Sequence, residues 1–313
     1  MSKVMNSHIE IGTFVFRDRI NSVTTKSSWK ALADTASIKL PNLKRLADGK
    51  RAEDLIHVGD TVVIKLGYDG KLQNEFTGYV SSIKPTIPLE IICEDEMWQL
   101  KRRTVTQSWR SVKLREVLEF LVPDAVVDCP DITLSPFRLD NVSVAKALQK
   151  LKEEYLLCAY FREKKLYVGL PYFELMPTVY YHFQKNALMD GLEYKREDDV
   201  KVKIKAIGIS PDNKREQVEV GDDTGDTITM NFYNKKGDEL KAMAEQKLKE
   251  IKYDGYRGRF IAFGQPFPKH GMVCDLMDGR YPERAGKFFT DSIETNFSSS
   301  GFRRTIEPGR RAS

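Results

Sequence analysis

Short runs in which apolar and polar residues alternate dominate the chain, and the clearest of these runs begins at Thr61. From Thr61 to Leu66 every second residue is apolar, which predicts a strand with one buried face. The next four residues, Gly67-Tyr68-Asp69-Gly70, predict a tight hairpin turn, because Asp-Gly suits positive φ angles. Residues 76–83 and 89–93 continue the alternation. This stretch therefore predicts a meander of short strands, typical of half of a small barrel or sandwich.

Alternation of the same kind returns near the N-terminus and in the last third of the chain. Residues 27–36 interrupt it and predict a short helical turn. The remaining strands are expected at 9–23, 38–40, 201–205, 216–220, 227–233, 256–263, 272–276, 287–297 and 302–306. Most of the chain is thus predicted to be β-structure.

Three segments carry the helical spacing of apolar residues instead. Two of them, residues 112–122 and 144–155, are expected to begin at the N-caps Ser111 and Ser143. The third helix is expected at about 238–252, among the strands of the last third.

The first two helices define a small α/β module at residues 106–175. Strands at 158–162 and 165–169, joined by a charged turn, are expected to complete it. Leu118 and Leu148 lie on the apolar faces of the two helices and are expected core residues.

The chain then divides into three expected domains: a first barrel at 1–105, the inserted module at 106–175, and a second barrel at 176–313 that contains the third helix. Residues 59–83 and 271–293 echo each other, since both contain a glycine, a strand, an Asp-Gly pair and a second strand ending in Ser-Ile. Such features also recur by chance, so the repeat is weak when taken alone.

Composition sets mild limits on function. The chain has 313 residues and a net charge of +5, from 50 basic and 45 acidic residues. This balance alone does not argue for nucleic acid, because a binding surface needs clustered charge. The four cysteines are far apart and lack metal-ligand spacing, so buried free thiols in a reducing cytoplasm are expected.

The N-terminal residues lack the charged region, long apolar core and cleavage site of a signal peptide. No apolar run approaches the roughly 18 residues of a membrane span. We therefore expect a protein made in the cytoplasm that does not insert into a membrane.

Catalytic motifs are scarce. The four histidines show no HxH or HExxH spacing, and there is neither a phosphate-binding loop nor a Gly-x-Ser-x-Gly elbow. The acidic clusters at 94–96, 198–199 and 222–223 read as solvated turns or strand ends, because neighbouring residues in a strand point to opposite faces. We expect no catalytic residues, cofactor or metal, and no enzymatic activity.

Two groups of basic residues invite a functional interpretation. Lys201, Lys203 and Lys205 lie on one face of a predicted strand, which is either the solvent face of a sheet or a positive wall facing the passage of a ring. Arg303 and Arg304, with Arg310 and Arg311 beyond them, form either a frayed terminus or a strip that meets a partner.

Several of these segments together resemble a known family. The matching parts are Gly59-Asp60 with the following strand, Phe76-Thr77-Gly78-Tyr79-Val80, the run from Cys93 to Lys101, Gly286-Lys287-Phe288-Phe289, and the closing run from Gly301 to Ile306. The pattern resembles the baseplate hub proteins of contractile phage tails, the late-control-D-like proteins, which are related to the hub of T-even phages. The resemblance covers nearly the whole chain through many short matches.

The resemblance implies a fold and an assembly. The fold would be mainly β with an α+β insertion, comprising two similar small barrels of tail-tube type and the α/β module. Three chains would form a ring that adapts a threefold spike to a sixfold tail tube and nucleates tube assembly. The partners would be the chain itself, a tail-tube protein, a spike protein and DNA in the lumen. The protein would be made in the bacterial host and assembled into the virion baseplate.

Two other functions stay open at this point. The first is a nucleic-acid-binding β-barrel, which basic stripes with stacking aromatic residues would favour. The second is a peptidoglycan-cleaving tail enzyme, which the absence of convergent paired carboxylates disfavours.

Overall fold

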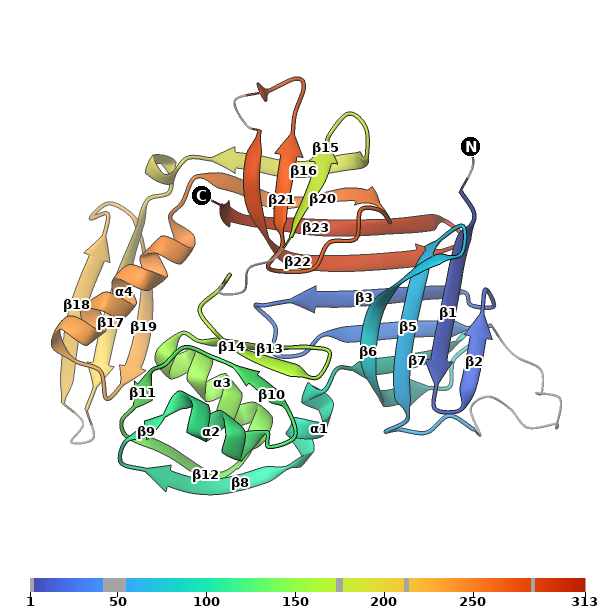
Figure 1. The fold of residues 1–313 in the computed structure, drawn as a ribbon. Helices are drawn as coiled ribbons and strands as arrows, with labels where there is room; N and C mark the ends of the chain where they lie inside the picture. Colours follow the sequence, from blue (N-terminus) through green and yellow to red (C-terminus); the bar gives the residue numbers. More distant parts are fainter. Residues whose placement is uncertain (1–2, 42–54, 173–176, 211–213, 283–284, 313) are drawn as a thin grey trace.

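The computed structural model describes residues 3–41, 55–172, 177–210, 214–282 and 285–312 (Figure 1). Thirteen of the described strands form one large sheet. Along its main path the strands are β16 (Ala187–Lys195), β20 (Gly255–Phe263), β23 (Gly301–Arg311), β22 (Gly286–Ser298), β3 (Ser22–Ser28), β4 (Thr35–Leu40), β7 (Leu89–Glu94), β6 (Lys71–Lys84), β5 (Thr61–Tyr68), β1 (Met5–Ile11) and β2 (Phe14–Arg17). Off this path lie β15 (Thr178–His182) and β21 (Val273–Met277), and β21 pairs with both β15 and β22.

The large sheet consists of two strand sets with the same order of neighbours. In the first strand set, β1 to β7, the order is β3-β4-β7-β6-β5-β1. In the second strand set, β15, β16 and β20 to β23, it is β16-β20-β23-β22-β21-β15. The sets differ at the last pair, which is antiparallel in the first set and parallel in the second. Two parts of one chain therefore share one connectivity.

Each strand set has its own apolar core, because its strands present alternate residues to one side. The first core is built from residues such as Ile9, Ile64 and Ile91, and the second from Phe260, Phe288 and Ile306. The predicted mainly β fold is confirmed.

The inserted module was predicted at residues 106–175. The elements that share its core, which we call the middle module, extend from residue 97 to residue 169 and lie at the bottom of Figure 1. It has one core, in which Leu118 and Leu148 are fully buried as predicted. Its elements are α1 (Met97–Arg102), β8 (Thr104–Trp109), β9 (Val112–Lys113), α2 (Leu114–Leu121), β10 (Val126–Asp128), β11 (Thr133–Leu134), β12 (Phe137–Ser143), α3 (Val144–Tyr155), β13 (Cys158–Arg162) and β14 (Lys165–Gly169).

Residues 197–251 form a further unit, which we call the outer module, seen at the left of Figure 1. It begins with the 3₁₀ turn η2 (Glu197–Asp199), and its elements are β17 (Val202–Ile209), β18 (Arg215–Gly221), β19 (Asp226–Tyr233) and α4 (Gly237–Ile251). Its three strands form a separate sheet in the order β18-β17-β19, and α4 packs on that sheet over its own apolar cluster. Within the expected domain at 176–313, these strands pair with each other and not with the second strand set, so they form a sheet of their own.

Two of the local predictions below are confirmed, and two are wrong. Asp69 and Gly70 have φ angles of 52° and 76°, as the predicted hairpin turn requires. The side chain of Ser143 accepts a hydrogen bond from the Lys146 backbone N–H, as predicted for an N-cap. Ser111 does not cap α2, because a short strand separates them. The helical turn expected at 27–36 is wrong, since the chain there passes from β3 through a bend to β4.

Candidate functional site: the seam between the two strand sets

The two strand sets meet at one antiparallel strand pair, which we call the seam (Figure 1). Ser22–Ser28 of β3 pair there with Ser292–Ser298 of β22, residue by residue. On one face of the seam, Lys26 lies 3.5 Å from Glu294, and Thr24 donates a 2.8 Å hydrogen bond to Asn296. A ladder of backbone hydrogen bonds therefore joins the two cores into one body.

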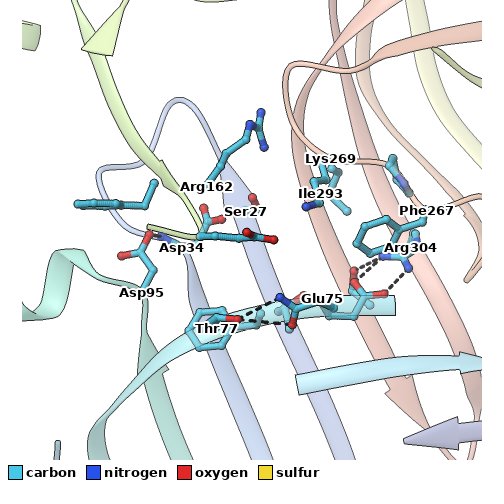
Figure 2. A pocket seen from close by; sticks show the side chains of 17 residues that line it. Ser27, Asp34, Glu75, Thr77, Asp95, Arg162, Phe267, Lys269, Ile293 and Arg304 are labelled. Carbon is cyan, nitrogen blue, oxygen red and sulfur yellow. Dashed lines mark hydrogen bonds and ion pairs between the residues drawn. The ribbon is translucent and has the colours of Figure 1, made fainter. Parts of the chain in front are cut away.

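A buried ion pair supports the seam from the other side (Figure 2). Arg304 of β23 binds Glu75 of β6 through both terminal nitrogens, one of them at 2.9 Å from a carboxylate oxygen, and the two side chains are 2% and 3% exposed. The same guanidinium donates to Thr295 at 2.8 Å and to the Gly264 carbonyl at 2.8 Å. Because every partner is satisfied, the charge pair links the two sets without leaving an unpaired buried group.

This geometry corrects one prediction. Arg304 was expected either in a frayed terminus or on a strip of basic residues that meets a partner, but it is 1% exposed and its guanidinium binds groups within the chain. The neighbouring Arg303 is half-buried, and its guanidinium lies 4.9 Å from the ring centre of Phe263. Alternation along β23 explains the difference, since successive side chains point to opposite faces.

Asp291 forms a second polar centre beside the seam. It lies at a β-bulge of β22 and is buried. Its carboxylate accepts hydrogen bonds from the Trp29 indole at 3.0 Å and from the Tyr172 hydroxyl, and Lys30 lies 2.8 Å away. Burial disfavours the charged form of Lys30, but Asp291 and Glu307 outweigh it and raise the pKa of that ammonium. Asp291 thereby holds the turn after β3 and the segment after β14 against β22.

A small cavity of about 90 Å³ lies between the seam and the middle module, with Asp34, Asp95, Arg162 and Lys269 on its wall (Figure 2). Burial raises the pKa of Asp34 to about 6. Burial, together with the nearby charge of Asp34, raises the pKa of Asp95 to about 8. Asp95 is therefore not the solvated turn residue expected from its acidic neighbours.

The two carboxylates mainly hold backbone in place. Asp95 accepts the backbone N–H groups of Asp34 and Met97 at 2.9 and 3.0 Å, and Asp34 accepts that of Ser28 at 3.2 Å. Enclosed sites for small ligands usually measure about 300 Å³ or more. The cavity is well below that size, so the pair serves to fix the turn before β4 and the start of α1.

Lowering the pH should stabilise the protein through this pair. Both pKa values are raised above the ordinary 3.8. Between pH 3.8 and the raised pKa values, the folded chain therefore binds more protons than the unfolded chain. The contribution is complete below about 3.8 and is lost as the pH rises through about 6 and about 8. As the pH rises over this range, the free energy of unfolding of wild type in urea should fall by about 1–3 kcal/mol relative to that of Asp34→Asn. The control Asp140→Asn, at an exposed position, should follow wild type. Parallel curves for wild type and Asp34→Asn would contradict the assignment.

The structure places the other predicted basic residues in different surroundings. Lys201 directly precedes β17, and Lys203 and Lys205 lie on it. All three belong to the outer module, whose sheet is separate from the one that contains the seam. Lys203 lies 2.8 Å from Asp223, and Lys205 lies 4.0 Å from Glu219, so acidic neighbours offset much of this face. That these lysines face a lumen stays a prediction. Arg310 and Arg311 belong to the end of β23, so they are not a frayed terminus.

Sequence reasoning missed Glu75, Asp291 and the Asp34–Asp95 pair. Nothing local in the sequence marks these carboxylates, because their partners lie far away along the chain: Glu75 and Arg304, for example, are 229 residues apart. The four cysteines are all free and buried, as predicted. Among the described residues, no group of three or more histidine, cysteine or acidic side chains has the geometry of a metal site. None of the described helices has the length and apolar character needed to cross a membrane.

Comparison with known proteins gives structural relatives. No protein-family profile matches the sequence, and no curated protein is similar enough to count as a relative. Among solved structures, a tail protein from Neisseria meningitidis MC58 matches with a TM-score of 0.71 at 15% identity, over 98% of this chain and 96% of that chain. The 43 kDa tail protein of prophage MuSo2 from Shewanella oneidensis matches with a TM-score of 0.67 at 12% identity, over 97% and 98%.

A third structure extends the comparison beyond phages. An Escherichia coli component of the type VI secretion system, described as structurally similar to the bacteriophage T4 tail proteins gp27 and gp5, matches with a TM-score of 0.65 at 8% identity, over 97% of this chain and 79% of that chain. At these identities the matches establish the fold alone. The chain has the fold of phage tail proteins along nearly its whole length.

Proposed function

We propose that this chain is a structural hub at the centre of a phage-tail baseplate, or of a related contractile injection machine, of the late-control-D-like type. Support comes from the fold shared with two tail proteins and with the type VI secretion component over at least 97% of the chain. Such a hub acts by setting the geometry in which other proteins assemble, and not by catalysing a reaction. We therefore propose no catalytic role for the carboxylates at the seam.

The observation that carries the proposal is the common strand order of the two sets, joined through the seam. Three chains in a ring would present six such sets, arranged with approximate sixfold symmetry. A surface of that kind suits a hexameric tail-tube protein, while the true threefold axis suits a trimeric spike. The hub would thus adapt one symmetry to the other and give the first layer of the tube a template.

The mass of the purified protein in solution tests the proposal. Light scattering after size exclusion should give three times the 35.9 kDa of one chain, either alone or with the tail-tube protein of the same element. Electron micrographs of this species should show rings with threefold symmetry. A protein that stays monomeric at every concentration, with and without the tube protein, would contradict the ring.

The same sample tests the competing nucleic-acid function. A hub that only surrounds DNA in a lumen should not shift free single-stranded DNA at physiological salt. A binder of single strands should shift it, and the shift should weaken steeply as salt rises. A strong, salt-sensitive shift by monomeric protein would favour the nucleic-acid function over the hub.

A further inference from the structure

The two strand sets correspond residue by residue, and not only in strand order. Gly59 donates its backbone N–H to the Val80 carbonyl, and Val80 donates back to the Asp60 carbonyl. Gly271 and Thr290 make the same pair of bonds, with Met272 in the place of Asp60. Both glycines have positive φ angles, 99° and 84°. The long strand β6 at Val80 is therefore equivalent to the long strand β22 at Thr290.

A shared β-bulge extends the equivalence. Where β6 pairs with β7, the register skips Ser81 between Val80 and Ser82. Where β22 pairs with β23, it skips Asp291 between Thr290 and Ser292. A bulge adds one unpaired residue and bends the strand. The next residues are equivalent in turn, which makes Ser82, Ile83 and Lys84 the counterparts of Ser292, Ile293 and Glu294.

Equivalent strands differ in how their edges are used. On one edge β22 pairs with β23, and on the other it pairs first with β21 and then, from Ser292 onwards, with β3. On one edge β6 pairs with β7, and on the other it pairs with β5 as far as Tyr79. From Ser82 to Lys84 this second edge has no partner among the described strands.

The counterpart of β3 also has an open edge. Strand β3 lies between β4 and β22, whereas β16 ends the large sheet and pairs only with β20 among the described strands. Pairing fixes the register: Lys26 lies opposite Thr35 on β4, and Glu193 lies opposite Arg257 on β20. Thr35 and Arg257 are equivalent positions when the pairing is followed from the shared β-bulge, through β7 to β4 in one set and through β23 to β20 in the other. Glu193, Tyr194 and Lys195 are therefore the counterparts of Lys26, Ser27 and Ser28.

We propose that β6 of one chain pairs antiparallel with β16 of the next chain, placing Ser82, Ile83 and Lys84 opposite Lys195, Tyr194 and Glu193. This inference rests on the proposed ring of three chains. The contact repeats between chains what the seam does within one, so each ring would have six equivalent strand junctions. It would also cover two open strand edges, which otherwise invite unspecific pairing.

Charge supports this register. Within the seam, Glu294 of β22 faces Lys26 of β3 at 3.5 Å. Between chains, Lys84 of β6 would face Glu193 of β16, the same ion pair with the charges exchanged. Both residues are exposed in the single chain, with Glu193 at 71%. A shift by one residue would place Lys84 opposite Tyr194, or Ile83 opposite Glu193, and would lose this match.

Cysteine cross-linking tests the register. Residues directly opposite in an antiparallel pair have Cα atoms about 4.5–5.5 Å apart, within the range of a disulfide. The double variant Lys84→Cys/Glu193→Cys should form covalent dimers and trimers under mild oxidation. The matched control Lys84→Cys/Leu188→Cys moves the second cysteine roughly 17 Å along β16 and should not cross-link. The described native cysteines are buried and should stay silent.

Charge reversal provides the second readout. Lys84→Glu and Glu193→Lys should each raise the concentration needed for trimer formation about tenfold, because like charges then meet at every interface. The double variant Lys84→Glu/Glu193→Lys should recover most of this loss. Lys71→Glu, the same change elsewhere on β6, should assemble as wild type does.

The outcomes separate this inference from the proposed function. Trimers that form normally in all charge variants and do not cross-link through positions 84 and 193 would overturn the strand register and leave the hub intact. A wild-type chain that never forms trimers would overturn both. Cross-linking at the control positions and not at 84 and 193 would show a different register.

Discussion

Replacing Arg304 with methionine should lower the free energy of unfolding by about 3–5 kcal/mol. Methionine fills much of the same volume but leaves Glu75, at 3% exposure, as a buried charge without its partner. It also removes the donors to Thr295 and to the Gly264 carbonyl. Since Glu75 belongs to the first strand set and Arg304 to the second, the loss should appear as weaker attachment of the sets. Urea unfolding followed by circular dichroism measures it.

Two further variants give this experiment its contrast. Arg303→Met changes the adjacent arginine, which is half-buried over the Phe263 ring and lacks a buried carboxylate partner among the described residues, so it should cost about 1 kcal/mol or less. Glu75→Met/Arg304→Met removes both charges and should recover most of the loss, because an apolar pair leaves no uncompensated charge. A loss below about 1 kcal/mol in Arg304→Met would refute the structural role of the pair.

Leu118→Ala should cost about 2–5 kcal/mol in the unfolding of the middle module. The side chain is fully buried in the cluster that α2 shares with α3 and the surrounding short strands. Truncation removes apolar contacts and leaves a cavity that the neighbouring elements fill only in part. Urea unfolding, with hydrogen exchange to locate the loss in residues 97–169, measures the effect.

The neighbouring residue supplies the control. Glu119 is exposed on the same helix, so Glu119→Ala should change stability by no more than about 0.5 kcal/mol. A cost well under 1 kcal/mol for Leu118→Ala would mean that the apolar face of α2 is loosely packed. Assembly of the proposed ring should survive either change, because α2 lies outside the large sheet.

The sequence by itself determined the local structure. Alternation fixed most strands, since one buried face demands an apolar residue at every second position. The Asp69-Gly70 turn and the Ser143 cap follow from short-range backbone preferences. Short elements could not be predicted in this way. Helix α1, for example, buries only Met97 and Leu100, which are too few residues to show a helical period.

Tertiary structure decided which strands pair and which polar groups meet. The alternation of β17 predicts a strand but not its partners, because an apolar face can pack on any apolar partner. Only the structure shows that β17 pairs with β18 and β19 and not with the second strand set. From the sequence, Glu75 and Arg304 would each be interpreted as a surface charge. The fold brings the two side chains together and excludes water from both. The seam depends on contacts more than 260 residues apart in the chain, and only the closed arrangement of both sets reveals it.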